Sequence, residues 1–428
     1  MKVTDASPDN ALEMTLAQSP SENIFTTTEG QRDLPALFPR IFDIISRIEV
    51  GALEFELPDG RVFRAQGATP GQTGRMIVHR PKMFWRMATG AELGFAESYL
   101  DGDWSTPDLQ AVLDVAIENN KAVARGLPKS RWIAAFESLQ HWLNRNTRRQ
   151  ARKNIEAHYD LGNQFYGKWL DPSMTYSAGL FEEPGESLED AQRNKYRSIC
   201  DRMGLRQGDH VLEVGCGWGG FAEYAARERG AKVTGLTISP AQLEFAQRRM
   251  QEQGLNERVE LVLRDYRDER GQYDGVASIE MFEAVGEKYW PSFFETVHDR
   301  LKPGAQASLQ IITIADDLFE RYRNRVDFIQ KYIFPGGMLP SVAALEDQTA
   351  RSGLEWVDIK RFGEGYSETL RQWRTRFLDV WDEVQALPSD KAAFDERFRR
   401  MWEFYLAICA ACFRAGTTDV VQLSLKRA

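Results

Sequence analysis

The chain has 428 residues and a formal net charge of −9, with 43% hydrophobic and 27% charged residues. This composition is typical of a globular protein and excludes collagen-like, fibrous and wholly disordered chains. The longest apolar runs fall short of the roughly 18 to 20 residues that a membrane-spanning helix needs, and the polar N-terminus gives no secretory signal. Four cysteines are too few for a disulfide framework, so we expect a protein of the reducing cytoplasm.

The N-terminal third predicts a small α+β domain over residues 31–150, after a loose polar segment over residues 1–30. Apolar residues at helical spacing between residues 34 and 48 indicate an amphipathic helix. Two short strands flank a turn at Pro58, Asp59 and Gly60, which is typical of a hairpin. A further strand and helices are expected up to residue 120.

Positive charge is concentrated in residues 121–153, which hold nine basic residues and one acidic residue, Glu137. Trp132, Phe136, Leu139 and Leu143 mark the apolar face of a helix in this segment. A basic amphipathic helix suits an anionic membrane surface, where each Lys or Arg contributes about 1 kcal/mol. A core-packed helix with a solvated basic tip explains the pattern equally well. Nucleic acid is disfavoured, because the acidic remainder of the chain would repel it.

Residues 151–428 predict an α/β domain, because short apolar strands alternate with helical segments from about residue 200. We expect a seven-stranded, doubly wound Rossmann-like sheet. Its strands are predicted at residues 210–214, 231–236, 258–263, 273–279, 306–314, 354–361 and 419–426. Two helical insertions rich in aromatic residues, 316–335 and 364–416, are candidate walls for an apolar pocket, although such residues also form ordinary core.

A glycine-rich turn, GCGWGG at residues 215–220, follows the first of these strands and precedes a helix. Glycines let the backbone approach a ligand at the carboxyl end of a strand. The turn satisfies G-x-G-x-x-G, but a dinucleotide site also needs an acid about 20 residues further on. Here the second strand ends in GLTI at residues 235–238. NAD is therefore disfavoured, and a nucleoside held in another way is favoured.

Seven motifs stand in order along the chain: HYDLGNQFY (158–166), MTYS (174–177), GCGWGG (215–220), LTISPAQ (236–242), RDYRD (264–268), MFEAVG (281–286) and YIFPGGMLPS (332–341). Together they resemble the cyclopropane fatty acid synthase family, densely over residues 150–428 and loosely before that, where the family has a lipid-binding domain. The resemblance implies transfer of one carbon from S-adenosylmethionine to the double bond of an unsaturated acyl chain, usually in a membrane phospholipid. It also implies a peripheral place at the inner membrane surface, and it allows a homodimer.

The resemblance assigns eight residues to the cofactor: Tyr176, Ser177, Gly215, Gly217, Thr237, Gln242, Tyr266 and Arg267. Tyr176 and Ser177 would lie near its methionine end, and Gly215 and Gly217 beneath it. Thr237 and Gln242 would face the ribose, and Tyr266 and Arg267 would border the adenine. Hydroxyl and amide groups can hydrogen-bond a ribose without charge, and a tyrosine face can stack on adenine. The alternative is that the tyrosines are half-buried aromatics and that Thr237 and Gln242 belong to a helix start.

The implied reaction leaves a carbocation in an apolar tunnel, and a proton must then be removed. The resemblance places Glu283 at the reacting centre, where the family holds a bicarbonate ion that takes the proton. It assigns Ala178, Gln310, Ile312 and Tyr366 to the same centre. The alternative for Glu283 is an acid meeting a helix dipole. Aromatic faces can stabilise a cation by about 2 kcal/mol, and the candidates are Tyr332, Tyr366, Trp290, Phe282 and Phe334.

Three positions depart from the family pattern: Ala178 replaces a common cysteine, and Ala284 and Gln310 replace common histidines. Gln310 can donate a hydrogen bond to bicarbonate but cannot titrate. A different base acting on a different carbon would give a methyl or methylene branch instead of a ring. A small-molecule methyltransferase and a non-catalytic lipid-binding protein are further alternatives. The histidine spacing indicates no metal site.

Overall fold

The computed structural model describes residues 24–124, 161–389 and 392–428. Its N-terminal part contains a five-stranded sheet in the order β1-β3-β2-β4-β5. The elements are β1 (Ile24–Phe25), α1 (Phe38–Ile45), β2 (Val50–Glu56), β3 (Val62–Gln66), β4 (Thr69–Val78), α2 (Lys82–Leu100), β5 (Trp104–Ser105), α3 (Leu109–Glu118) and α4 (Asn120–Ala124). Strands β2 and β3 pair antiparallel, which confirms the predicted hairpin.

The predicted amphipathic helix is α1, and its buried residues are Phe38, Ile41, Phe42 and Ile45. Spacing by three and four places them on one face. The ring centroid of Phe38 lies 5.0 Å from that of Phe63 on β3. This aromatic contact fixes α1 on the small sheet and confirms the α+β character of the N-terminal part.

The larger sheet confirms the predicted doubly wound α/β fold. Its strands are β6 (His210–Val214), β7 (Lys232–Thr237), β8 (Val259–Leu263), β9 (Tyr273–Ile279), β10 (Leu301–Ile314), β11 (Leu354–Arg361) and β12 (Thr418–Arg427). Their order is β11-β12-β10-β9-β6-β7-β8. Only β12 runs antiparallel to its neighbours within this sheet. The order reverses between β6 and β9, and open α/β sheets bind ligands at such a switch point.

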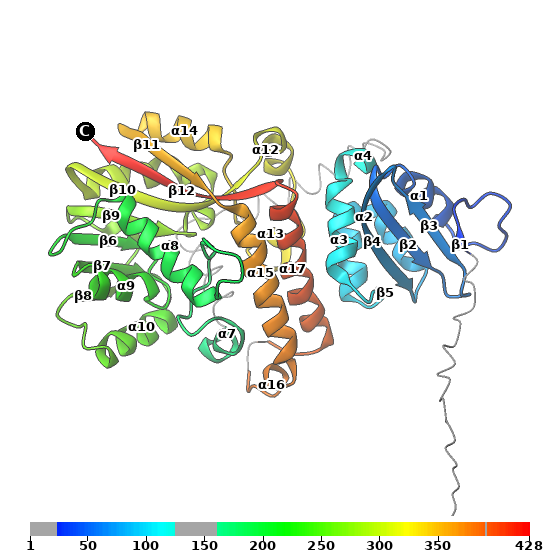
Figure 1. Cartoon of the computed structure of the whole chain (residues 1–428), viewed down its shortest axis with the longest axis horizontal. Coiled ribbons are helices and arrows are strands. Elements are labelled where there is room, and N and C mark those ends of the chain that lie inside the picture. The colour runs from blue at the N-terminus through cyan, green and yellow to red at the C-terminus, as the bar shows by residue number, and fades with distance from the viewer. Residues whose placement is uncertain (1–23, 125–160, 390–391) are drawn as a thin grey trace, which may run out of the picture.

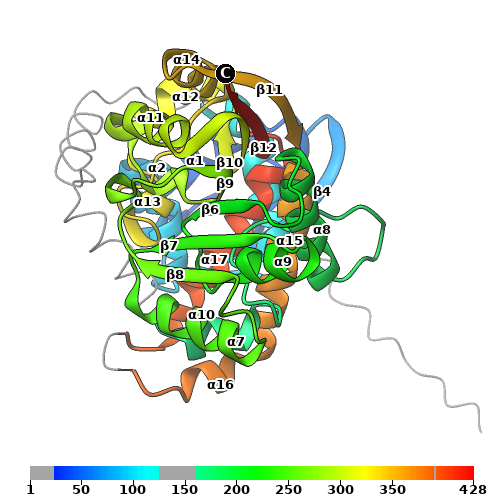
Figure 2. The same cartoon turned by 90° about the vertical axis from the view of Figure 1, so that its left-hand side faces the viewer.

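Helices cover both faces of this sheet (Figures 1 and 2). Residues of α8 (Leu188–Arg202), α9 (Gly220–Glu228) and α10 (Pro240–Glu252) form the core on one face. Residues of α11 (Trp290–Arg300) and α14 (Val342–Arg351) form the core on the other. The loops after β6 and β9 are therefore held between two packed layers, at the edge where the site is expected.

The two aromatic-rich segments are helical insertions, as predicted. They are α12 (Asp316–Arg323) and α13 (Phe328–Tyr332), then α15 (Gly363–Asp379), α16 (Trp381–Gln385) and α17 (Glu396–Arg414). A short helix, α7 (Asn163–Trp169), precedes the large sheet. In Figure 1, α15 and α17 stand between the large sheet and the N-terminal part. One continuous hydrophobic core joins α1, α2, α3, α7, α15 and α17.

The expected domain boundary near residue 150 and most of the basic segment 121–153 lie outside the described residues. The same holds for the N-terminal segment up to residue 23. None of the helices in the described part of the chain is both long and apolar enough to cross a bilayer.

Candidate active site

The glycine turn lies at the switch point of the large sheet, between β6 and α9. Gly215 has φ +87°, and a Cβ there would lie 2.8 Å from Cγ of Met281. Only glycine meets both constraints. The N–H groups of Gly215 and Cys216 both donate to the carbonyl of Leu236, at 3.0 and 2.8 Å. These bonds fix the turn against β7, and the backbone of the turn lines the cavity.

Thr237 and Gln242 lie at the end of β7 and in the first turn of α10. The helix cap is Ser239, whose Oγ accepts from the N–H of Gln242 at 3.3 Å. The hydroxyl of Thr237 donates to Oε1 of Gln242 at 3.3 Å. Both side chains are buried and line the same cavity as the glycine turn. A hydroxyl and an amide there fit the polar edge of a nucleoside.

Arg267 is held beside Tyr266 by a carboxylate. Its Nε and Nη2 donate to the two oxygens of Asp265, at 2.8 and 2.6 Å. This hydrogen bonding raises the pKa of Arg267 above its usual value. The guanidinium carbon also lies 5.5 Å from the ring centroid of Tyr266. The guanidinium of Arg267 is thus held in a fixed orientation on the wall of the cavity.

Tyr176 and Ser177 lie in a network that links α8 to α17. The hydroxyls of Tyr176 and Tyr405 are 2.9 Å apart. Lys195, which is fully buried, donates from Nζ to Oγ of Ser177 at 2.6 Å. Burial lowers the pKa of Lys195 to about 7. Lys195 was missed in the sequence, because a lysine in an amphipathic helix is normally solvated.

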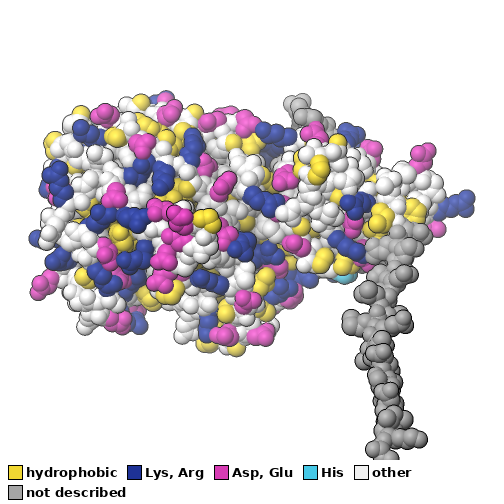
Figure 3. All heavy atoms as spheres, in the orientation of Figure 1, with side chains coloured by type: hydrophobic (Ala, Val, Ile, Leu, Met, Phe, Trp, Pro, Cys, Tyr) yellow, Lys and Arg dark blue, Asp and Glu magenta, His cyan; other side chains and the backbone are white. Residues whose placement is uncertain are grey.

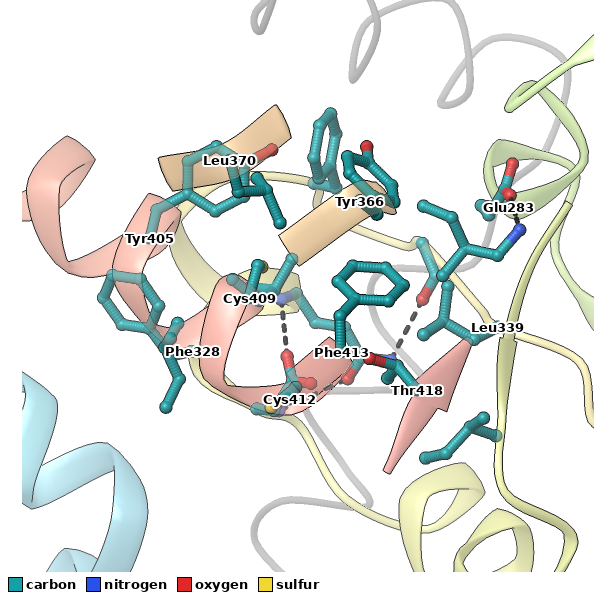
Figure 4. Close-up of a pocket in the computed structure, with 18 of the residues that line it drawn as sticks. Glu283, Phe328, Leu339, Tyr366, Leu370, Tyr405, Cys409, Cys412, Phe413 and Thr418 are labelled. Atoms are coloured by element: carbon teal, nitrogen blue, oxygen red, sulfur yellow. Dashed lines mark hydrogen bonds between the residues drawn. The ribbon is translucent and has the colours of Figure 1, made fainter. Parts of the chain in front are cut away.

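All eight predicted cofactor residues line one cavity of about 820 Å³. From the glycine turn it continues to apolar walls on α13, α15, α17, α1 and α3. Figure 4 shows Tyr405, Cys409, Cys412 and Phe413 of α17 on the wall, with Tyr366 and Leu370 of α15 beside them and Glu283 across the space. The two apolar insertions predicted as pocket walls do line the pocket.

Three of the predicted reacting-centre residues converge on one carboxylate, that of Glu280. The N–H of Ala178 and Nε2 of Gln310 both donate to its Oε1, each at 2.8 Å. The hydroxyl of Tyr366 donates to its Oε2 at 2.7 Å. Glu280 was missed in the sequence analysis. The sequence did contain a signal for Glu280: it is an acidic residue directly after the strand β9, three residues before Glu283.

Glu283 lies beside this group in the short 3-10 helix η2 (Phe282–Ala284). Its Oε1 accepts from the N–H of Ile312 at 2.5 Å. Its Oε2 is buried and has no hydrogen-bond partner among the described residues. Burial, and then the charge of Glu280, raise the pKa of Glu283 to about 8. A three-residue helix has little dipole, so the predicted dipole role is not supported.

The five candidate aromatic residues separate into two groups. Tyr366 and Phe334 line the cavity. Phe282 and Trp290 instead stack on each other in the core, with ring centroids 5.4 Å apart. The hydroxyl of Tyr332 donates to Glu97 at 2.7 Å. Over residues 24–124, 161–389 and 392–428, no group of three His, Cys, Asp or Glu side chains could hold a metal ion.

A doubly wound sheet whose switch point carries a glycine turn, with Thr237, Gln242 and Tyr266 on the same cavity, is the arrangement of an S-adenosylmethionine-dependent methyltransferase. The family model described as mycolic acid cyclopropane synthetase matches residues 146–423, and the chain belongs to this family.

Relatives of known description are similar over most of the chain. The tuberculostearic acid methyltransferase UfaA1 of Mycobacterium tuberculosis is 40% identical over 375 residues, which cover 85% of this chain and 86% of the relative. The cyclopropane-fatty-acyl-phospholipid synthase of Escherichia coli is 34% identical over 388 residues, covering 87% and 96%. The structure of the mycolic acid cyclopropane synthase CmaA1, complexed with SAH and CTAB, matches with a TM-score of 0.60 and 28% identity, covering 64% of this chain and 98% of that one.

Proposed function

We propose that this enzyme transfers one carbon from S-adenosylmethionine to the double bond of an unsaturated fatty acyl chain in a membrane phospholipid, with a cyclopropane ring as the product. The observation that carries this proposal is the single cavity. It joins the glycine turn at residues 215–220 to the buried carboxyls of Glu280 and Glu283 and to apolar walls on α13, α15 and α17. Such walls suit an acyl chain, which carries no polar group to satisfy.

The proposed roles follow from where the side chains lie. When bound, S-adenosylmethionine supplies an electrophilic methyl group. Thr237 and Gln242 bind the ribose hydroxyls, Tyr266 stacks on the adenine, and Tyr176 with Ser177 orients the methionine end. The faces of Tyr366 and Phe334 stabilise positive charge on the acyl chain, by about 2 kcal/mol each. The apolar walls disfavour water near the acyl chain, which would otherwise trap that charge.

A branched product is a second candidate. Gln310 and Ala284 stand where the ring-forming family commonly has histidines, and the 40% identical relative is described as a tuberculostearic acid methyltransferase. On this alternative the same cation collapses to a methyl- or methylene-branched chain without ring closure. A small-molecule methyltransferase is a more distant alternative, and it would not bind vesicles.

Docking to an anionic inner membrane surface is proposed from the basic segment 121–153. The face drawn in Figure 3 shows basic and acidic side chains interspersed. A mixed face gives little net attraction to anionic lipid. We expect the basic segment to attach the enzyme to its substrate, because positive charge is concentrated there in the sequence.

The test is to incubate the protein with S-adenosylmethionine and vesicles of monounsaturated phospholipid, with and without anionic lipid. The released fatty acids are analysed by mass spectrometry before and after catalytic hydrogenation. A chain longer by one carbon that resists mild hydrogenation is the expected ring. A product that takes up hydrogen and is branched supports the second candidate. No product on any vesicle would contradict lipid modification, and equal rates on neutral vesicles would contradict electrostatic docking.

A further inference from the structure

We propose that the carboxylate of Glu280 is the proton acceptor of this reaction, built into the position that the family resemblance gives to a bicarbonate ion. This inference rests on the proposed function. Ala178, Gln310 and Tyr366 were expected to surround that ion, and their three donor groups are all occupied by Glu280. A carboxylate and a bicarbonate ion are both planar anions with two or more acceptor oxygens. The residues present therefore do not leave donors for a separate ion.

The orientation of the Gln310 amide supports this arrangement. Ser198 donates to Oε1 of Gln422 at 2.5 Å, so the amide nitrogen of Gln422 faces the other way. That nitrogen donates to Oε1 of Gln310 at 3.2 Å. The amide nitrogen of Gln310 is thereby turned toward Glu280. A chain of hydrogen bonds from α8 through β12 to β10 thus presents a donor, and never an acceptor, to the carboxylate.

The two buried carboxyls differ in their partners, and this sets which one holds the charge. Glu280 accepts three hydrogen bonds, whereas Glu283 accepts one from Ile312. Hydrogen bonds to a carboxylate favour its ionised form. Burial raises the pKa of both carboxyls. Two neighbouring buried acids do not both ionise readily, so Glu280 takes the charge and Glu283 keeps a proton.

The backbone at Glu280 points to the same role. Its φ is +49°, a left-handed conformation that is uncommon for a residue with a side chain. The N–H of Glu280 donates to the carbonyl of Gln310 at 2.8 Å, which holds this conformation. Strained backbone of this kind is energetically unfavourable and clusters at functional sites. Here it brings the carboxylate between β10, α15 and the segment at Ala178.

The step balances without a further reactant. One alkene carbon bonds to the transferred methyl group, the methyl–sulfur bond breaks with its electron pair left on sulfur, and the other alkene carbon becomes cationic. Glu280 removes a proton from the added methyl group, and the C–H electron pair closes the ring. After a hydride shift between the two former alkene carbons, the same proton removal gives a methylene branch. Glu280 leaves the step as a neutral acid and returns its proton to water.

Two variants of Glu280 test the proposal. Glu280→Gln keeps the shape and removes the basicity, so kcat should fall by about 10² to 10⁴-fold while the affinity for S-adenosylmethionine stays unchanged. Glu280→Gly suits the left-handed backbone and leaves space for a small anion. It should be inactive in bicarbonate-free buffer and recover with added bicarbonate or formate. Glu346→Gln, at an exposed position on α14, is the matched control and should behave as the wild type.

The wild type itself gives the deciding readouts. Its turnover should not change when bicarbonate is removed. Titration with ¹³C-bicarbonate, followed by NMR, should detect binding to Glu280→Gly but not to the wild type. Bicarbonate binding by the wild type, or near-normal turnover of Glu280→Gln, would overturn the role of Glu280. A wild type that is inactive on every lipid but still excludes bicarbonate would contradict only the proposed function.

Discussion

Glu213 is a further buried acid, and its environment raises the pKa of its carboxyl group. It lies on β6, is 2% exposed, and its Oε2 has no hydrogen-bond partner among the described residues. Burial raises its pKa from 4.5 to about 8, against the opposing charges of Lys195 and Arg249. The folded protein therefore binds more protons than the unfolded chain between these two values. Its contribution to the free energy of unfolding is fully present below the lower value and is lost as pH rises through the upper one.

Glu213→Gln should remove this pH dependence. At about pH 8 the variant should melt a few degrees above the wild type, because no buried carboxylate has to ionise. At about pH 5 the two proteins should melt within a degree or so of each other, since Glu213 is then protonated. Thermal melts across this range give the comparison. An unchanged slope of Tm against pH in the variant would show that Glu213 does not titrate in this window.

Residue types at matching motif positions were enough to predict which residues line the cavity beside the glycine turn. Tyr176, Thr237 and Tyr266 line the cavity as expected. Thr237 ends β7 and Tyr266 lies three residues after β8, whereas Tyr176 is near no strand and was predicted from its motif alone. Glu280 could not be recognised in this way. Its partners come from three distant segments, and they meet it only through the left-handed backbone and the pairing of β9 with β10.

Helix α17 contributes both to the hydrophobic core and to the apolar wall of the cavity. Phe398, Trp402 and Leu406 are buried in the core shared with α15. Ile408 and Cys412 line the cavity. The sequence left pocket wall and ordinary core as alternatives for this segment, and both are correct on different faces. Periodicity predicts that a helix has an apolar face, but not what covers it.

Ile408→Trp should obstruct the apolar part of the cavity. The added ring should lower kcat/KM for long-chain phospholipid at least tenfold while leaving the affinity for S-adenosylmethionine unchanged, because Ile408 lies away from the glycine turn. Ile408→Val is the matched control and should cost little. Turnover against acyl chains of different length, beside calorimetric cofactor titration, measures both effects. Equal turnover of all three proteins would place the acyl chain elsewhere.

At the scale of the whole molecule, the strands and the doubly wound character of the large sheet were predictable, but the antiparallel place of β12 was not. All seven predicted strands of the large sheet exist, and most of them are short apolar runs that alternate with helices. The antiparallel place of β12 between β10 and β11 depends on pairings between residues at least 60 positions apart in sequence. Nor does local pattern reveal that α17 packs on the N-terminal part. Arg400 of α17 donates to the carbonyls of Tyr99 and Trp104, at 3.1 and 3.3 Å.

Arg400→Ala should loosen this contact between the two parts. The guanidinium carbon also lies 5.0 Å from the ring centroid of Tyr99. Loss of these contacts should lower the free energy of unfolding by about 1 to 3 kcal/mol. Arg371→Ala on α15, an exposed position paired with Glu368 of the same helix, should cost less than 1 kcal/mol. Urea unfolding measures both, and equal losses would mean that Arg400 does not join the two parts.

The left-handed backbone at residue 280 also bears on how such an enzyme can evolve. Glutamate and glycine codons differ at a single nucleotide, and glycine adopts this conformation without strain. On our proposal, one point mutation therefore exchanges a proton acceptor encoded in the gene for one drawn from solution, or the reverse, without rebuilding the strand or its neighbours. An enzyme that carries the glutamate works at a rate that does not depend on the supply of dissolved carbon dioxide around it.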